Sequence, residues 1–378
     1  MHGRIRQRIE DFYVEEIPGD IKVDPNGKYA IFWLEKMNWD TMRAIMRLAK
    51  AFGVSKKRFG IAGTKDKRAI TRQLVSVWDV PKEKIESVKL KDMKLEYFCN
   101  SNERITLGML HGNKFVITIR DVPESEDEIA RELEVVKKDL ERGIPNIFGP
   151  QRFGEVRPIT AEVGKAMLRG NFEGAVKTYL TKVFPLEPED AKRARNFLAE
   201  HWGDFAGALE LFPKRLHWER AMLEYLKIHP HDFAGALRRI PKRLRKMFIN
   251  AVQSEVWNNA LLEAFENYGV IESNLPLPGY DTVLDEKDPL QKVLTEKLEE
   301  AGIKLSDFKV HSMPELACTG SQRATILKVN DFKVEEIKDD ELNTGKRKVK
   351  VSFSLPPGSY ASVVLDYFLK PSAPRENE

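Results

Sequence analysis

Asp11-Phe-Tyr-Val-Glu-Glu-Ile17 is a strand-like run, and it returns near the far end of the chain as Asp331-Phe-Lys-Val-Glu-Glu-Ile337. Both copies contain the aromatic and β-branched residues that pack well on a pleated sheet. Similar runs lie in the same two end regions, and we predict strands at 29–34, 72–78, 114–120, 323–329 and 348–355. The simplest fold is therefore α+β, with one mixed or antiparallel sheet built from both chain ends.

The middle of the chain is predicted to be mainly helical and contains an internal repeat. Asp204-Phe-Ala-Gly-Ala-Leu209 is repeated as Asp232-Phe-Ala-Gly-Ala-Leu237, and Asn171-Phe-Glu-Gly-Ala-Val176 is a weaker third copy. Such a repeat suggests stacked helical pairs, but two good copies favour a compact helical domain. We therefore predict a discontinuous strand-rich domain, an inserted helical domain and a frayed polar tail, at 1–157 with 319–370, at 158–318 and at 371–378.

The composition excludes several classes of protein. The 378 residues are 42% hydrophobic and 32% charged, which indicates folded domains and excludes a mostly disordered chain. No run reaches the roughly 18 apolar residues of a membrane span, and the N-terminus lacks the apolar core of a signal peptide. The two cysteines, Cys99 and Cys318, form no CxxC motif, so we expect no thiolate zinc site and a reducing, cytoplasmic compartment.

The net charge of +4 is small, but the basic residues are clustered. The run Arg238-Arg-Ile-Pro-Lys-Arg-Leu-Arg-Lys246 has six basic residues in nine, and shorter runs occur at 56–58 and 346–350. Any one of these runs is explained by an ordinary solvated face. The three runs together favour an anionic polymer as a partner.

The stretch with the most unusual composition is Phe59-Gly-Ile-Ala-Gly-Thr-Lys-Asp-Lys-Arg-Ala-Ile-Thr-Arg-Gln73. Gly60 and Gly63 are too close together for a phosphate loop, and Gly63 precedes threonine, so ATP or GTP binding is excluded. Asp66 has cationic neighbours in the sequence, and such neighbours favour the ionised carboxylate. An ionised carboxylate can act as a nucleophile or a base, although charge spacing alone favours a salt bridge within the loop.

A second stretch, Gly143–Gly154, combines two phenylalanines and three glycines with the planar polar groups of Asn146, Gln151 and Arg152. This composition suits a loop that approaches RNA closely, stacks on a base and hydrogen-bonds its edges. A tight turn at a domain junction is the alternative explanation, and both can hold together.

Three further stretches have ordinary structural explanations. Gly108–Phe115 is a turn that places Asn113 and Phe115 at the start of a strand. The apolar residues of 250–258 recur at helical spacing, which indicates that they pack in the core. Residues 355–361 are predicted to form a turn. The seven histidines form no HExxH or triad-like pattern, so no metal site is predicted.

Taken together and in this order, these stretches resemble the TruD family of tRNA pseudouridine synthases. Two motifs are highly specific: AGxKDxxAxTxQ at Ala62–Gln73 and NxFGxQRFG at Asn146–Gly154. The shorter motifs DFxVEE, GNxF, AxQSxxxN and LPxGSYA are found at Asp11–Glu16, Gly112–Phe115, Ala251–Asn258 and Leu355–Ala361. The resemblance spans residues 3–368, with one departure at Asp366-Tyr367, where relatives often carry an Arg-Glu pair.

The resemblance implies an archaeal isomerase that converts uridine to pseudouridine in tRNA, usually at position 13. The reaction breaks the N1–C1′ bond, rotates the uracil and joins C5 to C1′. It involves no redox step and no external group, so no cofactor and no metal are expected. The strand-rich domain would have the pseudouridine-synthase fold, and the insertion would be the TRUD domain. We expect a monomer that binds tRNA and no membrane.

The resemblance also implies roles for individual residues. The essential aspartate of the family falls on Asp66, which attacks the base or C1′ or takes a ribose proton. Arg6 would pair with it, Phe115 would stack on the extruded uracil, and Asn113 would position the base or Asp66. Seven further residues are expected to line or support the cleft that holds the substrate: Phe12, Glu16, Lys65, Asn146, Gln151, Arg152 and Phe153. Contacts to the RNA backbone are expected from Arg238, Arg239, Lys242, Arg243, Arg245 and Lys246.

Two other functions account for parts of the sequence. A catalytically inactive RNA-binding relative would share most motifs, but the intact Lys65-Asp66 pair speaks against it. A helical-repeat interaction protein would explain the repeated helical unit, but it leaves the glycine-rich loops unexplained.

Overall fold

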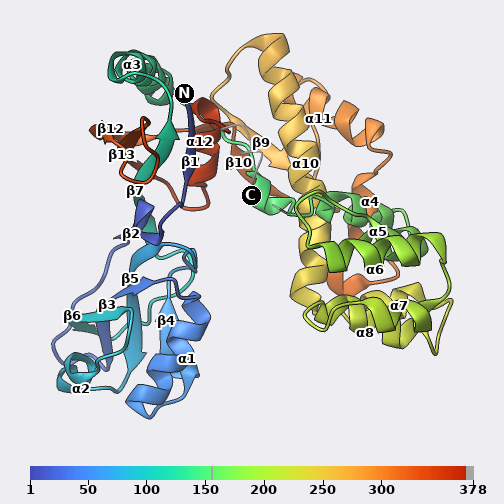
Figure 1. Ribbon diagram of the computed structural model, residues 1–378, viewed down its shortest axis with the longest axis horizontal. Helices are drawn as coiled ribbons and strands as arrows, with labels where there is room; N and C mark the ends of the chain where they lie inside the picture. The colour runs from blue at the N-terminus through green and yellow to red at the C-terminus, as the bar shows by residue number, and fades with distance from the viewer. Residues whose placement is uncertain (155, 372–378) are drawn as a thin grey trace. The chain divides into compact units, whose positions relative to one another are not determined.

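The computed structural model describes residues 1–154 and 156–371. The chain forms two compact units. The first, which we call the sheet unit, contains residues 1–144 and, of the described C-terminal part, 327–371. The second, the helical unit, is Pro145–Ile326. Each unit is described by itself below (Figure 1).

These limits differ from the predicted boundaries after residues 157 and 318. Asn146 gives the physical reason, because its backbone N–H donates to Thr325 O (2.9 Å) and its side-chain amide donates to Ala324 O (2.9 Å). Both junction segments are thereby bonded within the helical unit. Of the predicted tail, Pro371 belongs to strand β14 (Lys370–Pro371), and the remaining residues lie outside the described part of the chain.

Within the described residues, the sheet unit has a ten-stranded sheet whose main path is β12-β13-β7-β2-β5-β3-β6. The pairs β2–β5 and β1–β14 are parallel, and the remaining recorded pairs are antiparallel. The predicted α+β fold, with a mixed sheet from both chain ends, is confirmed. The strands are β1 (His2–Ile5), β2 (Phe12–Pro18), β3 (Tyr29–Met37), β4 (Phe59–Ile61), β5 (Ile70–Trp78), β6 (Met93–Ser101), β7 (Leu110–Val122), β12 (Asn330–Asp339), β13 (Arg347–Leu355) and β14.

Helix α1 covers one face of this sheet. It begins after Asp40, whose carboxylate accepts from the N–H of Arg43 (2.9 Å), and ends at Gly53, whose φ of 69° suits a helix C-cap. Leu48 of α1 packs in one core cluster with Phe32 of β3. The helices here are α1 (Thr41–Phe52), α2 (Lys82–Ser87), α3 (Glu126–Arg142) and α12 (Ala361–Phe368), with 3₁₀ turns η1 (Ile9–Asp11) and η2 (Lys56–Arg58).

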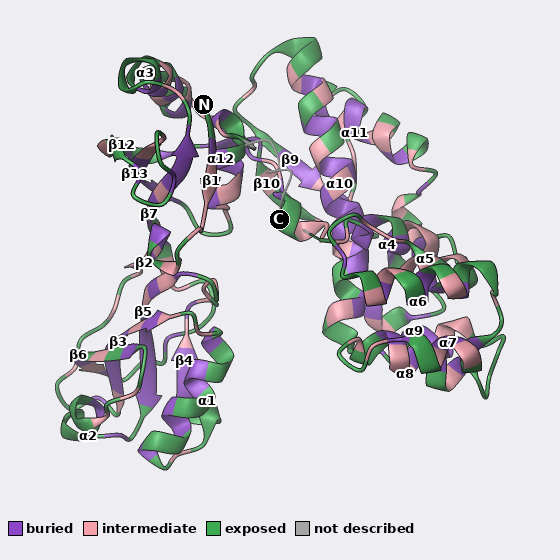
Figure 2. Cartoon of the chain, in the orientation of Figure 1, coloured by how far each residue is buried: buried purple, intermediate pink, exposed green. Residues whose placement is uncertain are grey.

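The helical unit is organised around the long helix α10, which has buried residues along most of its length and an exposed C-terminal end (Figure 2). Helix α4 crosses it closely at Gly164, where a Cβ atom would lie 2.2 Å from Phe248 O. Among the described residues, no helix is long and apolar enough to span a membrane. The helices are α4 (Thr160–Leu168), α5 (Phe172–Thr181), α6 (Glu189–Glu200), α7 (Phe205–Leu211), α8 (His217–Leu226), α9 (Phe233–Leu237), α10 (Lys242–Tyr268) and α11 (Pro289–Glu300).

Short strands and 3₁₀ turns complete the helical unit and its junctions. β9 pairs with β10 in an antiparallel ladder. The elements are β8 (Ile144–Pro145), β9 (Asn274–Leu277), β10 (Ser321–Ala324), β11 (Ile326–Leu327), η3 (Pro150–Arg152), η4 (Leu305–Lys309) and η5 (Pro314–Leu316).

The sequence repeat encodes a helix start. Asp204 and Asp232 are the N-cap residues of α7 and α9, and each accepts a hydrogen bond from the N–H of the glycine three residues later (2.9 and 2.8 Å). A Cβ atom on Gly207 or Gly235 would lie within 2.3 Å of that carboxylate, so glycine leaves room for the cap in this geometry. Helix α9 packs against α5 as well as α8, which gives the predicted compact domain and not an open array.

Candidate functional site

The loop between β4 and β5 carries Asp66 and is bonded to its surroundings through its main chain. The side-chain amide of Gln73 donates to Gly63 O (3.0 Å). The Thr41 hydroxyl accepts from the N–H of Lys65 (3.0 Å) and donates to its carbonyl oxygen (3.2 Å). Since Thr41 begins α1 and Gln73 lies in β5, packing of that helix on the sheet fixes the path of the loop.

Lys36 fixes the loop at Asp66 itself. Its side chain is 1% exposed, and Nζ donates to Asp66 O (3.0 Å) and Trp39 O (2.7 Å). Burial lowers the pKa of Lys36 to about 8, although the negative charges of Asp66 and Asp40 oppose that shift. Sequence reasoning missed Lys36. The available signal was its alternation with buried residues of β3, which places it on the covered face.

The Asp66 carboxylate is paired with Arg6. Arg6 Nη2 lies 2.7 Å from Asp66 Oδ2, and the Asp66 side chain is 40% exposed. The Arg6 guanidinium also lies 4.0 Å from the ring centroid of Phe12. Arg6 has φ 60°, an uncommon conformation for a residue with a side chain. The structure therefore brings Asp66 together with Arg6 and Phe12, which lie more than fifty residues earlier in the chain, and it leaves part of the carboxylate open to solvent.

Behind the loop lies a buried ion pair. Lys65 Nζ is 2.8 Å from Glu16 Oε2, and both side chains are almost fully buried. The backbone N–H of Leu74 donates to the other Glu16 oxygen (3.3 Å). Burial raises the pKa of Glu16, and the Lys65 charge opposes this shift. The pair stabilises the loop but leaves neither group accessible for chemistry.

Strand register places the predicted base-binding residues, Asn113 and Phe115, on the same face of the sheet as Glu16. Glu16 of β2 lies directly opposite Asn113 of β7, so their side chains share a face of the sheet. Phe115 lies two residues further along β7 and is 7% exposed. Its ring contacts Phe12 edge-on (6.3 Å between centroids) and stacks on Phe353 (5.5 Å). Phe115 is thus packed within an aromatic cluster in this structure.

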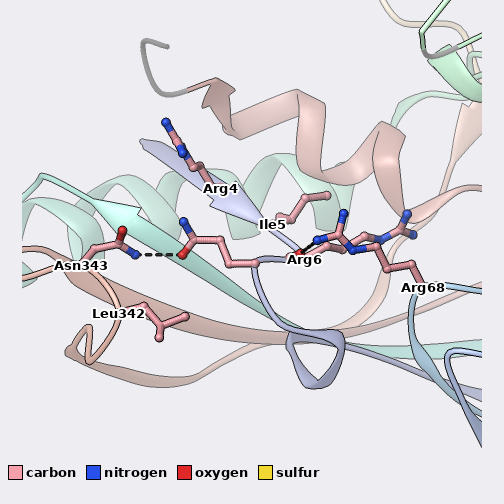
Figure 3. Close-up of a pocket in the computed structure, with 7 residues that line it drawn as sticks. Arg4, Ile5, Arg6, Arg68, Leu342 and Asn343 are labelled. Atoms are coloured by element: carbon pink, nitrogen blue, oxygen red, sulfur yellow. Dashed lines mark hydrogen bonds between the residues drawn. The ribbon is translucent and has the colours of Figure 1, made fainter. Parts of the chain in front are cut away.

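A basic hollow opens beside Arg6 in the sheet unit (Figure 3). Its described lining includes Arg4, Arg6 and Arg68 and no acidic residue. Arg4 is paired with Asp121 (3.3 Å) and Arg6 with Asp66. Arg68 is exposed and donates to the backbone carbonyl oxygen of Arg6 (2.8 Å). The hollow is therefore suited to an anionic group next to the Asp66 carboxylate, a feature that sequence reasoning missed.

The predicted residues of the NxFGxQRFG stretch lie in the other unit. Asn146 is buried, and its hydrogen bonds join the two chain segments at the junction. Its side-chain oxygen also accepts from Arg323 Nη2 (2.7 Å). Gln151 is exposed, while Phe153 and Arg152 are half-buried. The junction-turn interpretation of Asn146 is thus supported by its hydrogen bonds.

The basic run is divided between the surface and the interior. Arg245 is 7% exposed, and its guanidinium lies 2.7 Å from Glu315 and donates to Ile240 O (3.0 Å). This burial and pairing argue against the predicted contact of Arg245 with the RNA backbone, because its charge is used inside the helical unit. Arg238 is exposed but lies 3.8 Å from the same Glu315.

The other four residues of the run lie at or near the surface. Arg239 has its guanidinium 4.1 Å from the centroid of the Tyr225 ring. Lys242, Arg243 and Lys246 are exposed in the first two turns of α10. Within the part of the chain that the structure describes, these last three side chains have no recorded ion pair.

Comparison with known proteins accords with this fold and site. The model of the family tRNA pseudouridine synthase D (TruD) matches residues 1–274 and 267–368. The chain belongs to the TruD family. Relatives named "probable tRNA pseudouridine synthase D" include proteins from Methanosarcina barkeri (38% identical, 97% of this chain and 93% of the relative) and Methanopyrus kandleri (40% identical, 90% and 85%). The resemblance stated from the motifs is thereby confirmed.

A solved TruD structure has the same fold. The crystal structure ascribed to tRNA pseudouridine synthase D (TruD) of Methanosarcina mazei superposes with a TM-score of 0.83 at 36% identity, covering 97% of this chain and 93% of that chain. TruD membership therefore extends over both units, including the insertion.

Proposed function

We propose that this protein is a tRNA pseudouridine synthase in which Asp66 is the catalytic carboxylate. The observation that carries the proposal is the part-exposed Asp66 carboxylate, held 2.7 Å from Arg6 on a loop whose main chain is fixed by Lys36, Thr41 and Gln73. A rigid mount of this kind is what a reaction on an extruded base requires.

The chemistry needs one carboxylate and an ordered base. Uridine loses its N1–C1′ bond, the uracil turns, and C5 bonds to C1′ while the C5 proton is lost and N1 gains one. An ionised Asp66 suits each of three first steps: attack on the base, attack on C1′, or removal of a ribose proton. Arg6 pairs with the carboxylate and sets its direction.

The substrate is proposed to be tRNA, with uridine 13 as the target. The target uridine must leave the stack to reach Asp66. Asn113 would hydrogen-bond the uracil, and Phe115 would contact it once the aromatic cluster adjusts. Phe12, Glu16 and Lys65 would hold these groups in place.

Outside the target base, the RNA backbone would contact Arg68 in the basic hollow and the residues of the basic run that have no recorded ion pair with a described residue, Arg239, Lys242, Arg243 and Lys246. These contacts are to phosphates, so they would give affinity without reading sequence. We further propose that the protein acts in the cytoplasm as a monomer.

The decisive test is pseudouridine mapping at nucleotide resolution on unmodified tRNA transcripts, with wild type, Asp66→Asn and the control Arg47→Gln. Arg47 is an exposed residue of α1. We expect wild type and the control to modify one position and Asp66→Asn to lose on the order of 10⁴-fold in rate. Equal modification by Asp66→Asn would remove Asp66 from the mechanism. Tight binding without modification by any protein would favour the inactive RNA-binding relative.

A further inference from the structure

The helical unit contains a pocket of its own, with a volume of about 260 Å³. Its walls come from the loop and 3₁₀ turn around Phe148 and Arg152, from α10, and from the segment that leads into β10. The first two walls carry the NxFGxQRFG and AxQSxxxN stretches, which the Asp66 site does not use. Asn258 of α10 joins them, because its side chain accepts from Phe148 N (2.8 Å) and donates to Phe148 O (2.9 Å).

The charge of this pocket is one-sided. Arg152 and Lys246 line it, and none of the described lining residues is acidic. Neither cation has a recorded ion pair with any residue that the structure describes. Arg152 Nε is in addition buried without a hydrogen-bond partner there. A half-buried cation without a partner is unfavourable in the free protein, which indicates that its partner comes from a ligand.

The two arginines of this unit that are buried among the described residues are both paired with carboxylates, unlike the half-buried Arg152. Arg195 Nε lies 2.8 Å from Glu187 and its Nη2 lies 2.9 Å from Glu219. Arg245 is paired with Glu315 in the same way. Arg152 has no recorded carboxylate partner and, at Nε, no hydrogen-bond partner among the described residues.

The polar groups of the pocket are already held in place. Lys246, Asn250 and Gln253 share one side of α10, since they are four and three residues apart. Asn250 Oδ1 accepts from the Cys318 thiol (3.2 Å), and Gln253 Nε2 donates to Pro278 O (2.6 Å). Arg152 lies over the Phe148 ring, 5.2 Å from its centroid. A planar guanidinium in this position can contact phosphate oxygens with its edge.

We propose that this pocket binds one nucleotide of the substrate tRNA, separate from the target uridine, through its phosphodiester group. Arg152 and Lys246 take the phosphate oxygens, and Asn250 and Gln253 face the attached ribose or base. The volume admits the phosphate and part of one nucleotide and not a duplex. The inference rests on the proposed function for the identity of the RNA, and it makes the helical unit a second point of tRNA attachment.

The test measures tRNA binding and thermal unfolding of the full chain with Arg152→Met, Lys246→Gln and the control Lys292→Gln. Lys292 is an exposed lysine of α11 in the same unit. Each pocket variant should weaken binding about tenfold and reduce the slope of log affinity against log salt by about one, whereas the control should change neither. Without RNA, the Tm of Arg152→Met should equal or exceed that of wild type, because the variant removes an unpaired charge and keeps an unbranched stem.

Ethylation interference on the tRNA identifies the phosphate. At least one phosphate that blocks binding to wild type when ethylated should lose this effect with Lys246→Gln, and none should do so with Lys292→Gln. If both pocket variants keep the affinity and the salt slope of wild type, the proposal that this pocket binds RNA is wrong. If Arg152→Met lowers the Tm, Arg152 has a structural role. The binding measurements on Lys246→Gln alone then decide whether the pocket binds a phosphate of the tRNA.

Pseudouridine formation is measured in the same samples. Suppose that wild type modifies the tRNA and that both pocket variants bind it as tightly as wild type. The proposal that the pocket binds RNA would then be wrong, and the proposed function would be unaffected. Absence of modification by wild type, with weakened binding by both pocket variants, would overturn the proposed function and leave an RNA site in the helical unit.

Discussion

The Asp66 loop of the sheet unit and the pocket of the helical unit use cations in opposite ways. At the loop two cations are paired with carboxylates: Arg6 with Asp66 and Lys65 with Glu16. In the pocket, Arg152 and Lys246 have no recorded carboxylate among the described residues. A paired cation orients a group that belongs to the protein, whereas an unpaired one is available to a group that arrives. Mutations at the Asp66 loop and mutations in the pocket should therefore differ in whether they change stability, turnover or affinity.

The largest effect is expected where a pair is buried. Lys65→Met should lower the free energy of unfolding by about 3–5 kcal/mol, because it leaves the buried Glu16 carboxylate without its cation. Chemical denaturation measures this loss. The double variant with Glu16→Gln should recover most of it, whereas an equal loss in both variants would mean that the charge pair is not the cause.

The pH dependence of that loss follows from Glu16. Its pKa in the folded protein is raised by burial, so the folded state binds a proton more tightly than the unfolded chain does, and the cost of the carboxylate grows as the pH rises. In Lys65→Met the lost stability should shrink as the pH is lowered and Glu16 takes up a proton. A loss that is the same at pH 5 and pH 8 would contradict this account.

Arg6 should affect turnover more than stability, because its pair with Asp66 is partly exposed. Arg6→Met should lower the single-turnover rate about a hundredfold, while the Kd for tRNA changes little. Arg6→Lys should restore part of the rate, since it retains the charge but loses the planar fork. A parallel loss of affinity and rate would instead assign Arg6 to binding.

Much of this site was predictable from the sequence, because motif residues identify chemistry wherever they lie in the chain. Asp66, Arg6 and Phe12 were predicted and lie together. Lys36 and Thr41 were missed, since they act on the loop main chain through contacts that only tertiary packing creates. A lysine within a strand gives no sign in the sequence of which carbonyl oxygen it will reach.

Arg245 was misjudged for a different reason. The basic run was treated as one face, although a helix distributes consecutive residues around its axis. Arg245, Phe248 and Val252 follow the spacing of one stripe, and all three are buried. The phase of the apolar residues of α10 was the signal that separates Arg245 from its exposed neighbours.

Lys36 should have a moderate effect that depends on pH. Its pKa is about 8 when folded and 10.5 ordinarily, so between these values the unfolded chain holds a proton that the folded protein has lost. The contribution of Lys36 to the free energy of unfolding therefore rises with pH across this window, by roughly 2 kcal/mol between pH 7.5 and 9.5. Urea denaturation at both pH values should show this rise in wild type and in Lys50→Met, an exposed control on α1, but not in Lys36→Met.

The smallest effect is expected from Arg243, which is exposed in the first turn of α10 and lies outside the pocket lining. Arg243→Gln should weaken tRNA binding about threefold at low salt and leave the Tm unchanged, because it removes one solvated phosphate contact. Arg245→Met, two residues away, should lower the Tm, since it removes the partner of Glu315. If Arg243→Gln weakened binding as much as Lys246→Gln, the pocket would have no advantage over an ordinary basic surface. A clear difference between the two would show that an unpaired cation inside a pocket binds RNA more strongly than the same charge in open solvent.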